Sequence, residues 1–285
     1  TGKGILATLT HILVSEGFLE YDQPIAQHWP EFAQNGKGNI TLRHVLSHQS
    51  GLFDIRNTID TATEMLDWPH MLKVIEQATP RFSAGQGFAY QPLTYGWIIG
   101  GVLEKVTKQS LNSLMQRYLV QPLELDGAYF GTPSSELDRV ARLLEKPKKP
   151  SAPKLQAKKD NQPRKASLSE KFLVWSGQSP QDFQDAMIPK GMCNFSFYSD
   201  VGLQAVIPAA NGVFTADSLA KVYAMLANQG QLNGQQLIRP EVFEQLSTVQ
   251  SKARDRVMPI PMHWRLGYHR ILILLRQRVI IVCGD

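Results

Sequence analysis

The chain has 285 residues, of which 43% are hydrophobic and 19% are charged. This composition is typical of a globular protein and excludes a chain that is disordered over most of its length. The formal net charge is +5, but residues 146–171 hold nine Lys or Arg against two acidic residues, a net of +7, which leaves about −2 for the rest. The basic charge therefore belongs to one segment, and we expect no nucleic-acid partner for the folded body.

Residues 1–17 predict a helix. Apolar residues recur there at spacings of one, three and four, which is typical of an amphipathic helix with one buried face. Gly17 is the expected stop signal. The apolar residues of this pattern are Ile5, Leu6, Leu9, Ile12 and Leu13.

Capping residues and apolar spacing predict further helices in the first half of the chain. Thr41 begins a short helix that continues through His48, and residues 63–77 form a longer one. Residues 80–87 are rich in Gly, Pro and Ser and predict a loop. The remaining predicted elements of this half are a helix over 95–107 with a buried face and a helix capped by Ser110.

Residues 147–163 hold proline, lysine, alanine and glutamine with almost no large apolar residue. Such a segment buries too little surface to offset the entropy of ordering, so we interpret residues 146–171 as a flexible basic insertion. Contact with an anionic polymer or a membrane surface is the alternative for this segment. The elements predicted after it are a helix from Thr215 to Asn228, a turn at Asn233 and Gly234, a helix from Pro240, and strands within 264–282.

The sequence leaves the cellular compartment open between cytoplasm and periplasm. Cys193 and Cys283 are too few for a disulfide framework. We expect no membrane span, because charged residues interrupt the apolar stretch 271–283 before it reaches the roughly 18 to 20 residues that a membrane helix needs. The chain begins without methionine and within an expected helix, so the lack of a signal peptide says nothing about targeting.

One block of the sequence is long and specific. Residues 40–52 read ITLRHVLSHQSGL, which closely resembles the ITxRHLLxHxSGL block of the class C β-lactamase-related family of esterases, D-amino-peptidases and carboxypeptidases. We identify the chain as similar to the esterase-like branch of these serine β-lactamase-like and penicillin-binding-protein-like hydrolases. Further blocks that resemble the family, in the family's order, are residues 21–24, 122–126, 130–131, 208–212 and 226–240.

In that family the nucleophile is the serine of a Ser-x-x-Lys motif that opens a long helix. Thr1-Gly2-Lys3 matches its last three positions, so the resemblance implies a serine immediately before Thr1 and a catalytic role for Lys3. Residues three apart on a helix share a face, so the lysine amine would lie beside the serine oxygen. In a crowded, partly desolvated site this amine would help to take the serine proton. Without this context, Lys3 would be interpreted as a solvated surface lysine.

The second family motif, Tyr-x-Asn, is matched in part by Tyr90-Gln91-Pro92. The resemblance implies that Tyr90 is catalytic and that its oxygen relays protons during acylation and deacylation. The alternative for Tyr90 is a half-buried loop tyrosine with a satisfied hydroxyl. Pro92 replaces the asparagine amide that would bind a β-lactam, which favours ester or peptide hydrolysis over β-lactam hydrolysis.

The third family motif, Lys-Thr-Gly or His-x-Gly on a core strand, supplies an oxyanion donor in the family, and we find no match to it. Residues 264–270 resemble the strand before it, and residues 271–285 leave the family pattern. Since the serine is also expected before Thr1, we expect a catalytic-domain fragment that is truncated at both ends and inactive by itself.

Other candidate sites have weaker support. His44 and His48 would share a helix face, which invites a zinc site, but no third ligand is evident. Ser47 and Ser50 lack the G-x-S-x-G context of a nucleophile, and capping or turn roles explain them. Nothing near Cys193 supports a thiol nucleophile. We therefore expect neither a metal ion nor an organic cofactor.

Together these features predict an α+β protein with a β-lactamase/transpeptidase-like fold, an incomplete sheet and a large, mostly helical region. Residues 1–285 form one β-lactamase-related domain, with 1–35 and 205–285 in its sheet-bearing part and 36–204 in its helical part. The predicted function is hydrolysis of a small ester, amide or peptide through an acyl-enzyme, as in a carboxylesterase or a D-amino-acid peptidase. A non-catalytic homologue that acts as a binding or scaffold protein is the alternative, and the oligomeric state stays open.

Overall fold

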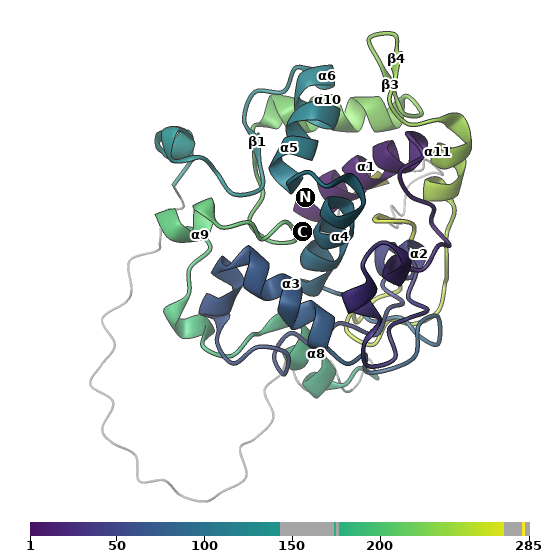
Figure 1. Cartoon of the computed structure of the whole chain (residues 1–285), viewed down its shortest axis with the longest axis vertical. Helices are drawn as coiled ribbons and strands as arrows, with labels where there is room; N and C mark the ends of the chain where they lie inside the picture. The colour runs from purple at the N-terminus through teal and green to yellow at the C-terminus, as the bar shows by residue number, and fades with distance from the viewer. Residues whose placement is uncertain (143–173, 175–176, 271–280, 283–285) are drawn as a thin grey trace, which may run out of the picture.

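The computed structural model describes residues 1–142, 174, 177–270 and 281–282. Helices dominate its regular structure and the strands are short, which confirms the predicted α+β class (Figure 1). The α-helices are α1 (Gly2–Ser15), α2 (Leu42–Leu46), α3 (Trp68–Gln77), α4 (Thr94–Thr107), α5 (Leu111–Met115), α6 (Gln121–Leu123), α8 (Pro180–Met187), α9 (Asp200–Gln204), α10 (Ala216–Ala227) and α11 (Pro240–Ser247). The shorter helical turns are η1 (Ile25–Gln27), η2 (Pro30–Ala33), η3 (Ala62–Leu66), the π-helical η4 (Gln116–Val120), η5 (Ser134–Arg139) and η6 (Met192–Asn194). The strands are β1 (Ala128–Tyr129), β2 (Val213–Phe214), β3 (Gln231–Leu232), β4 (Gln235–Gln236), β5 (His269–Arg270) and β6 (Ile281–Val282).

Helix α1 is buried on every side. It ends just before Gly17, as predicted, but residues 3–15 are all buried, whereas the apolar spacing predicted one buried face. The other face carries polar residues that form hydrogen bonds inside the protein. Apolar spacing cannot predict their burial. His11, for example, contacts the Tyr21 hydroxyl through Nδ1 at 2.7 Å and the Leu266 carbonyl oxygen through Nε2 at 3.0 Å. A helix buried all round in this way belongs to the centre of a core.

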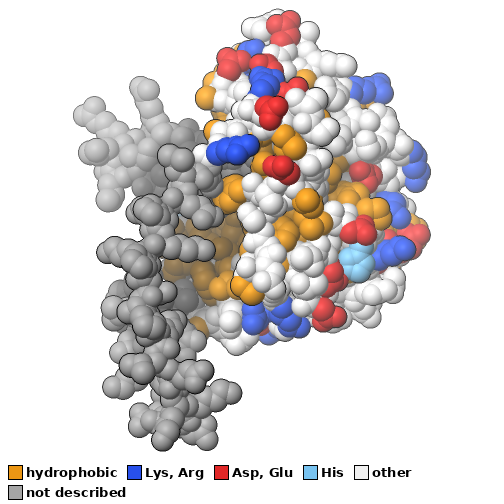
Figure 2. All heavy atoms as spheres, turned by 90° about the vertical axis from the view of Figure 1, so that its left-hand side faces the viewer, with side chains coloured by type: hydrophobic (Ala, Val, Ile, Leu, Met, Phe, Trp, Pro, Cys, Tyr) orange, Lys and Arg blue, Asp and Glu red, His pale blue; other side chains and the backbone are white. Residues whose placement is uncertain are grey.

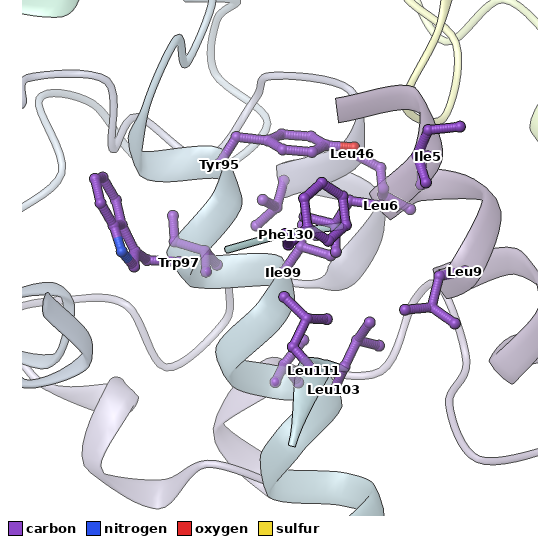
Figure 3. Packing of buried hydrophobic residues seen from close by; sticks show 14 of the residues in the cluster. Ile5, Leu6, Leu9, Leu46, Tyr95, Trp97, Ile99, Leu103, Leu111 and Phe130 are labelled. Carbon is purple, nitrogen blue, oxygen red and sulfur yellow. The ribbon is translucent and has the colours of Figure 1, made fainter. Parts of the chain in front are cut away.

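Helix α4 packs against α1 and completes the central core. Residues 94–103 of α4 are buried. Figure 3 shows Leu6 from α1, Ile99 from α4 and Phe130 from the segment after β1 pointing toward one another. Burial of side chains of this size stabilises a fold by roughly 1.5–3 kcal/mol each. This packing holds α1 in place and so fixes the position of its first turn.

Helix α2 is a short, capped helix. The Thr41 hydroxyl accepts from the His44 N–H at 3.3 Å, and His44 Nδ1 accepts from the Thr41 N–H at 3.1 Å, which together form a capping box. The helix begins where predicted but ends at Leu46, and His48 has a φ of 61°. The prediction that it continues through His48 is therefore wrong, and His44 and His48 do not share a helix face.

The single helix predicted over residues 63–77 is two elements, η3 and α3, separated by Asp67. Asp67 has extended backbone angles, and its Oδ1 accepts from the His70 N–H at 3.0 Å, which caps α3. Pro69 stands in the first turn of α3, where its missing N–H costs no hydrogen bond. The apolar spacing continues across the break and does not reveal it.

Elements of the C-terminal half that have local signals are confirmed. The Thr215 hydroxyl accepts from the Ser218 N–H at 3.2 Å at the start of α10. Asn233 and Gly234, with φ values of 49° and 80°, form the turn between β3 and β4. Helix α11 begins at Pro240, as predicted. Figure 1 shows α10, α11 and this hairpin grouped toward one end of the molecule and α3 and α8 toward the other.

The strands among the described residues form three separate antiparallel pairs, β1–β2, β3–β4 and β5–β6. Strand β1 lies within 36–204, whereas the other strands lie within 205–285. The division of the domain into a sheet-bearing and a helical part stays a prediction. The predicted basic insertion 146–171 lies outside the described residues, as does the tail 271–285 apart from β6.

Charged side chains of both signs are interspersed on the face of the molecule shown in Figure 2. In the part of the chain that the structure describes, no helix is long and apolar enough to cross a membrane. Cys193 is an exposed free thiol.

Candidate active site

Lys3 lies in the first turn of α1 and is buried, with 8% of its surface exposed. Its Nζ donates to the Ala209 carbonyl oxygen at 2.9 Å. Asn211 shapes the loop that carries this carbonyl, because its side chain accepts from the Ile207 N–H at 3.0 Å and donates to the Ala205 carbonyl oxygen at 2.6 Å. The amine is therefore largely removed from water and fixed at the start of α1.

Tyr90 lies beside Lys3, although the two are far apart in the sequence. The Lys3 Nζ is 5.2 Å from the centroid of the Tyr90 ring, within cation–π range. Tyr90 is 6% exposed and belongs to the loop that leads into α4. The structure thus brings together the two residues predicted from separate motifs, and their catalytic roles stay predictions.

Two further aromatic side chains surround the Tyr90 ring. Trp264 stacks on it, with ring centroids 5.5 Å apart and planes only 7° from parallel. His48 meets Tyr90 edge-on at a centroid distance of 5.0 Å and Trp264 at 4.2 Å. Such aromatic pairs contribute roughly 0.5–1.5 kcal/mol each beyond the burial of their area. Packing on both neighbours therefore orients the Tyr90 ring.

His48 is a neutral imidazole in this cluster. Burial, followed by the electrostatic effects of Lys3 and His269, holds the pKa of His48 well below its ordinary value of 6.5. Its Nδ1 accepts from the Gln91 N–H at 3.3 Å, so Nε2 carries the proton. A neutral ring packs against Tyr90 and Trp264 without placing a second positive charge beside the Lys3 amine.

Asp255 is 1% exposed and connects Tyr90 to Trp264 through its two carboxylate oxygens. Oδ1 accepts from the backbone N–H groups of Tyr90 at 3.1 Å, Val257 at 2.8 Å and Met258 at 2.9 Å. Oδ2 accepts from the indole N–H of Trp264 at 2.8 Å. All four partners are donors, which suits a carboxylate because an ionised carboxylate only accepts.

The segment after Trp264 is fastened to α1 and α2. The Gly267 N–H donates to the Leu46 carbonyl oxygen at 2.8 Å at the end of α2. The Tyr268 hydroxyl lies 2.8 Å from the Thr8 hydroxyl on α1. These contacts hold the segment that follows Trp264 against α1 and the end of α2.

The serines and the metal site considered as weaker candidates gain no support as catalytic or binding groups. Ser47 Oγ donates to the Arg43 carbonyl oxygen at 2.7 Å, and Ser50 Oγ accepts from the Leu52 N–H at 3.2 Å, which are the local roles predicted for them. Among the residues described, no three His, Cys, Asp or Glu side chains gather into a group that could hold a metal ion.

A cavity of about 570 Å³ lies between η5, α9 and the loop 210–212. It adjoins the loop that binds Lys3, but neither Lys3 nor Tyr90 lines it. The geometry of the Lys3 and Tyr90 side chains therefore identifies the candidate site better than the cavity does.

Sequence reasoning missed three neighbours of Tyr90, namely His48, Trp264 and Asp255. His48 lies within the specific block 40–52, and Trp264 lies in a segment that resembles a family strand, so each had a signal that pointed to the site region. Asp255 had no signal, because its role depends on a contact with Tyr90 that only the folded chain creates.

Comparisons with known proteins identify sequences and folds similar to this chain. A model of the Beta-lactamase family matches residues 1–271. The chain is 32% identical over 269 residues to Esterase/beta-lactamase LipL of Mycobacterium tuberculosis, which covers 94% of this chain and 59% of LipL. It is 29% identical over 157 residues to Esterase EstB of Burkholderia gladioli, which covers 49% of this chain and 38% of EstB. The chain thus spans less than two thirds of the length of either relative.

Solved structures show the same relationship. A penicillin-binding protein homologue from Caulobacter crescentus has a TM-score of 0.74 and 31% identity, and the match covers 94% of this chain and 65% of that one. A family VIII carboxylesterase has a TM-score of 0.76 and 27% identity with the same coverage. These matches confirm the predicted β-lactamase/transpeptidase-like fold and the resemblance to esterases and penicillin-binding proteins. Because the family model matches almost all of it, the chain belongs to the β-lactamase family.

Proposed function

We propose that the complete protein is a serine hydrolase that cleaves an ester or amide through an acyl-enzyme. In this proposal the nucleophile is a serine immediately N-terminal to Thr1, and Lys3 and Tyr90 handle its protons. The observation that carries the proposal is the meeting of Lys3 and Tyr90 at the start of α1, where the amine lies 5.2 Å from the ring centroid. A side chain one turn before Lys3 on the same helix face would lie next to both.

The proposed reaction has two steps. In the first, the serine oxygen attacks the substrate carbonyl carbon, its proton passes to the Lys3 and Tyr90 pair, and the same pair returns a proton to the departing alcohol or amine. In the second, water attacks the acyl-enzyme carbonyl and gives a proton to the pair. The serine oxygen then takes a proton back as the carboxylic acid leaves.

Esters are the substrate class that we propose first. Pro92 stands two residues after Tyr90, at the position where a β-lactam-binding amide is expected, and it offers no side-chain hydrogen bond. The relatives of this chain at 27% identity or more include proteins named as esterases or carboxylesterases. A D-amino-acid peptide or amide is the second substrate class.

Labelling with a fluorophosphonate tests the nucleophile, because this probe reacts with activated serines. We expect the complete protein to label and a Ser→Ala change at the position immediately before Thr1 to abolish the label. A residue other than serine at that position, or a folded complete protein that does not label, would support the alternative of a non-catalytic binding or scaffold protein.

Substitutions test the two proton-handling residues. We expect Tyr90→Phe and Lys3→Met in the complete protein to lower kcat for p-nitrophenyl butyrate by roughly 10²–10⁴-fold, the usual contribution of general acid–base catalysis. Tyr90→Phe removes only a hydroxyl, so its effect reports on proton transfer more cleanly than a larger change. Full kcat in folded Tyr90→Phe would contradict the role of Tyr90.

Matched controls are available elsewhere in the chain. Tyr21 is a buried tyrosine whose hydroxyl contacts His11, and Lys37 is a buried lysine whose Nζ donates to the carbonyl oxygens of Gln34 at 2.7 Å and Glu76 at 3.0 Å. Tyr21→Phe and Lys37→Met make the same chemical changes away from the site. We expect both to lose stability and to keep kcat.

A further inference from the structure

We propose that Asp255 is a positioning residue for Tyr90, through which it sets the rate of the chemical step. The inference rests on the proposed function, because it assumes that the Tyr90 hydroxyl transfers protons. Asp255 itself touches neither the reacting atoms nor Lys3 in the contacts described above, and it acts on the backbone and on the ring of Tyr90 by separate routes.

The first route is the backbone. The Tyr90 N–H donates to Asp255 Oδ1 at 3.1 Å, and the Arg256 N–H next to it donates to the Phe88 carbonyl oxygen at 2.8 Å. Phe88 and Asp255 thus form a short parallel bridge between the Tyr90 loop and the 255–258 segment. This bridge and the hydrogen bond from the Tyr90 N–H to the Asp255 carboxylate together fix the backbone of Tyr90.

The second route is the ring. Asp255 Oδ2 accepts from the Trp264 indole at 2.8 Å, and that indole stacks on the Tyr90 ring with planes 7° from parallel. His48 packs edge-on against both rings. The indole cannot rotate without losing its hydrogen bond to Asp255, and the Tyr90 ring cannot tilt without losing its stack on the indole.

The two routes meet at one carboxylate, which makes Asp255 hard to replace. A carboxylate accepts all four N–H groups that point at it, those of Tyr90, Val257, Met258 and Trp264. An asparagine has one acceptor oxygen, and its NH₂ group would face a donor on the other side. Asp255→Asn therefore keeps the size and shape of the side chain but must lose either the hydrogen bonds from the backbone N–H groups or the one from the Trp264 indole.

The test is a double-mutant cycle in the complete protein, with hydrolysis of p-nitrophenyl butyrate as the readout. We expect Asp255→Asn to lower kcat by about 10–100-fold with KM changed by less than about threefold, because displacement of a catalytic group by about 1 Å costs on the order of 10²-fold. In the Tyr90→Phe background we expect Asp255→Asn to cause almost no further loss, since the hydroxyl that it positions is gone.

Asp185→Asn is the matched control for a general effect of a buried carboxylate. Asp185 is 2% exposed, and its side chain binds Gln181 and Arg81. We expect this variant to lose stability and to keep kcat. If Asp255→Asn does not fold, Trp264→Phe serves instead, because it removes one of the four hydrogen bonds and keeps an aromatic ring. Its loss of kcat, about 3–10-fold, should also vanish in the Tyr90→Phe background.

The outcomes separate this inference from the function on which it rests. An unchanged kcat in Asp255→Asn, or the same fold-loss with and without the Tyr90 hydroxyl, overturns the inference and leaves the proposed function standing. Full kcat in Tyr90→Phe alone overturns the role of Tyr90, and the inference falls with it. A loss of kcat that disappears in the Tyr90→Phe background supports both.

Discussion

Gly267, in the segment after Trp264, lies tightly against α1. Its φ is 83°, and a Cβ built on it would lie 2.2 Å from the Cβ of Ala7. Ala7 is one turn beyond Lys3 on α1. A side chain at position 267 would therefore push directly on the helix that carries Lys3.

We expect Gly267→Ala to lower the free energy of unfolding by about 3 kcal/mol, from about 1 kcal/mol for the left-handed backbone and roughly 1–3 kcal/mol for the overlap. Gly234→Ala is the matched control, because Gly234 has a φ of 80° and nothing within 4 Å of its built Cβ. It should lose only about 1 kcal/mol. Equal losses in the two variants, measured by urea denaturation, would show that the approach to Ala7 is not tight.

At the level of single residues, candidate site residues could be predicted where they belong to a short sequence motif. Lys3 and Tyr90 could be named as candidates from the resemblance, because each belongs to a family motif of three or four consecutive positions, and their catalytic roles stay predictions. Asp255 could not, because a buried carboxylate is recognised by its donors, and two of these, Tyr90 and Trp264, are brought to it only by folding. The structure therefore adds to the candidate site those residues that hold the motif residues in place.

At the level of elements, α8 is held to the body of the protein through Arg81. Its Nη1 lies 2.6 Å from Asp54 Oδ2 and 3.4 Å from Asp185 Oδ2, and its Nη2 lies 3.9 Å from Asp182 Oδ1. The Asp185 side chain is 2% exposed and that of Asp54 is 11% exposed. One guanidinium thus neutralises two carboxylates that are nearly out of reach of water.

We expect Arg81→Gln to destabilise the protein by about 1–2 kcal/mol and to loosen α8. The loss of one partner of a fully buried pair costs roughly 3–5 kcal/mol, but the Arg81 side chain is 41% exposed, so solvent screens part of the effect. Hydrogen exchange should show faster exchange of the α8 amides than in the parent protein, with α10 unchanged.

Arg139→Gln is the control for this prediction. Arg139 also binds two carboxylates, Asp126 at 2.8 Å and Glu136 at 2.7 Å, but the Asp126 side chain is 73% exposed. We expect a smaller loss of stability and no change in α8, since exposed ion pairs contribute little. An Arg81→Gln variant whose α8 exchanges no faster than in Arg139→Gln would contradict the role of Arg81.

Helices with caps could be predicted from the sequence, whereas breaks and short strands could not. Thr41 and Thr215 marked true helix starts because an N-cap bond spans only three residues. The break at Asp67 was missed because the apolar spacing runs through it. Strands β1 and β2 have two residues each, too few for any alternation, and their pairing joins distant segments.

At the level of the whole molecule, α1 joins segments from the beginning and from the end of the described sequence. Its residue His11 lies between the Tyr21 hydroxyl and the Leu266 carbonyl oxygen, at 2.7 Å and 3.0 Å. The family motifs predicted the fold class correctly because they are spread along most of the chain. How α1 gathers the distant segments around itself depends on buried polar pairs such as these, which leave no periodic signal in the sequence.

Buried histidines make the stability of this arrangement depend on pH. Burial lowers the pKa of His11 from 6.5 to about 3, although the hydrogen bond to Leu266 opposes the shift. Below pH 6.5 the unfolded chain therefore binds a proton on His11 that the native protein does not bind, so stability is lost as the pH falls from about 6.5 toward 3. Burial lowers the pKa of His48 as well, so His48 adds a loss of the same sign.

His11 alone should account for a loss of about 2 kcal/mol in the free energy of unfolding between pH 7.5 and pH 5. Urea denaturation across that range measures the total loss, and His11→Gln isolates the part due to this residue. The variant should be less stable at pH 7.5, because a glutamine cannot keep both contacts of the imidazole, with Tyr21 and Leu266. Its further loss on acidification should be about 2 kcal/mol smaller than that of the parent, since it has no imidazole to protonate in the unfolded state. Parallel losses in the two proteins would mean that His11 takes up its proton in the native protein as readily as in the unfolded chain, and burial would then not lower its pKa.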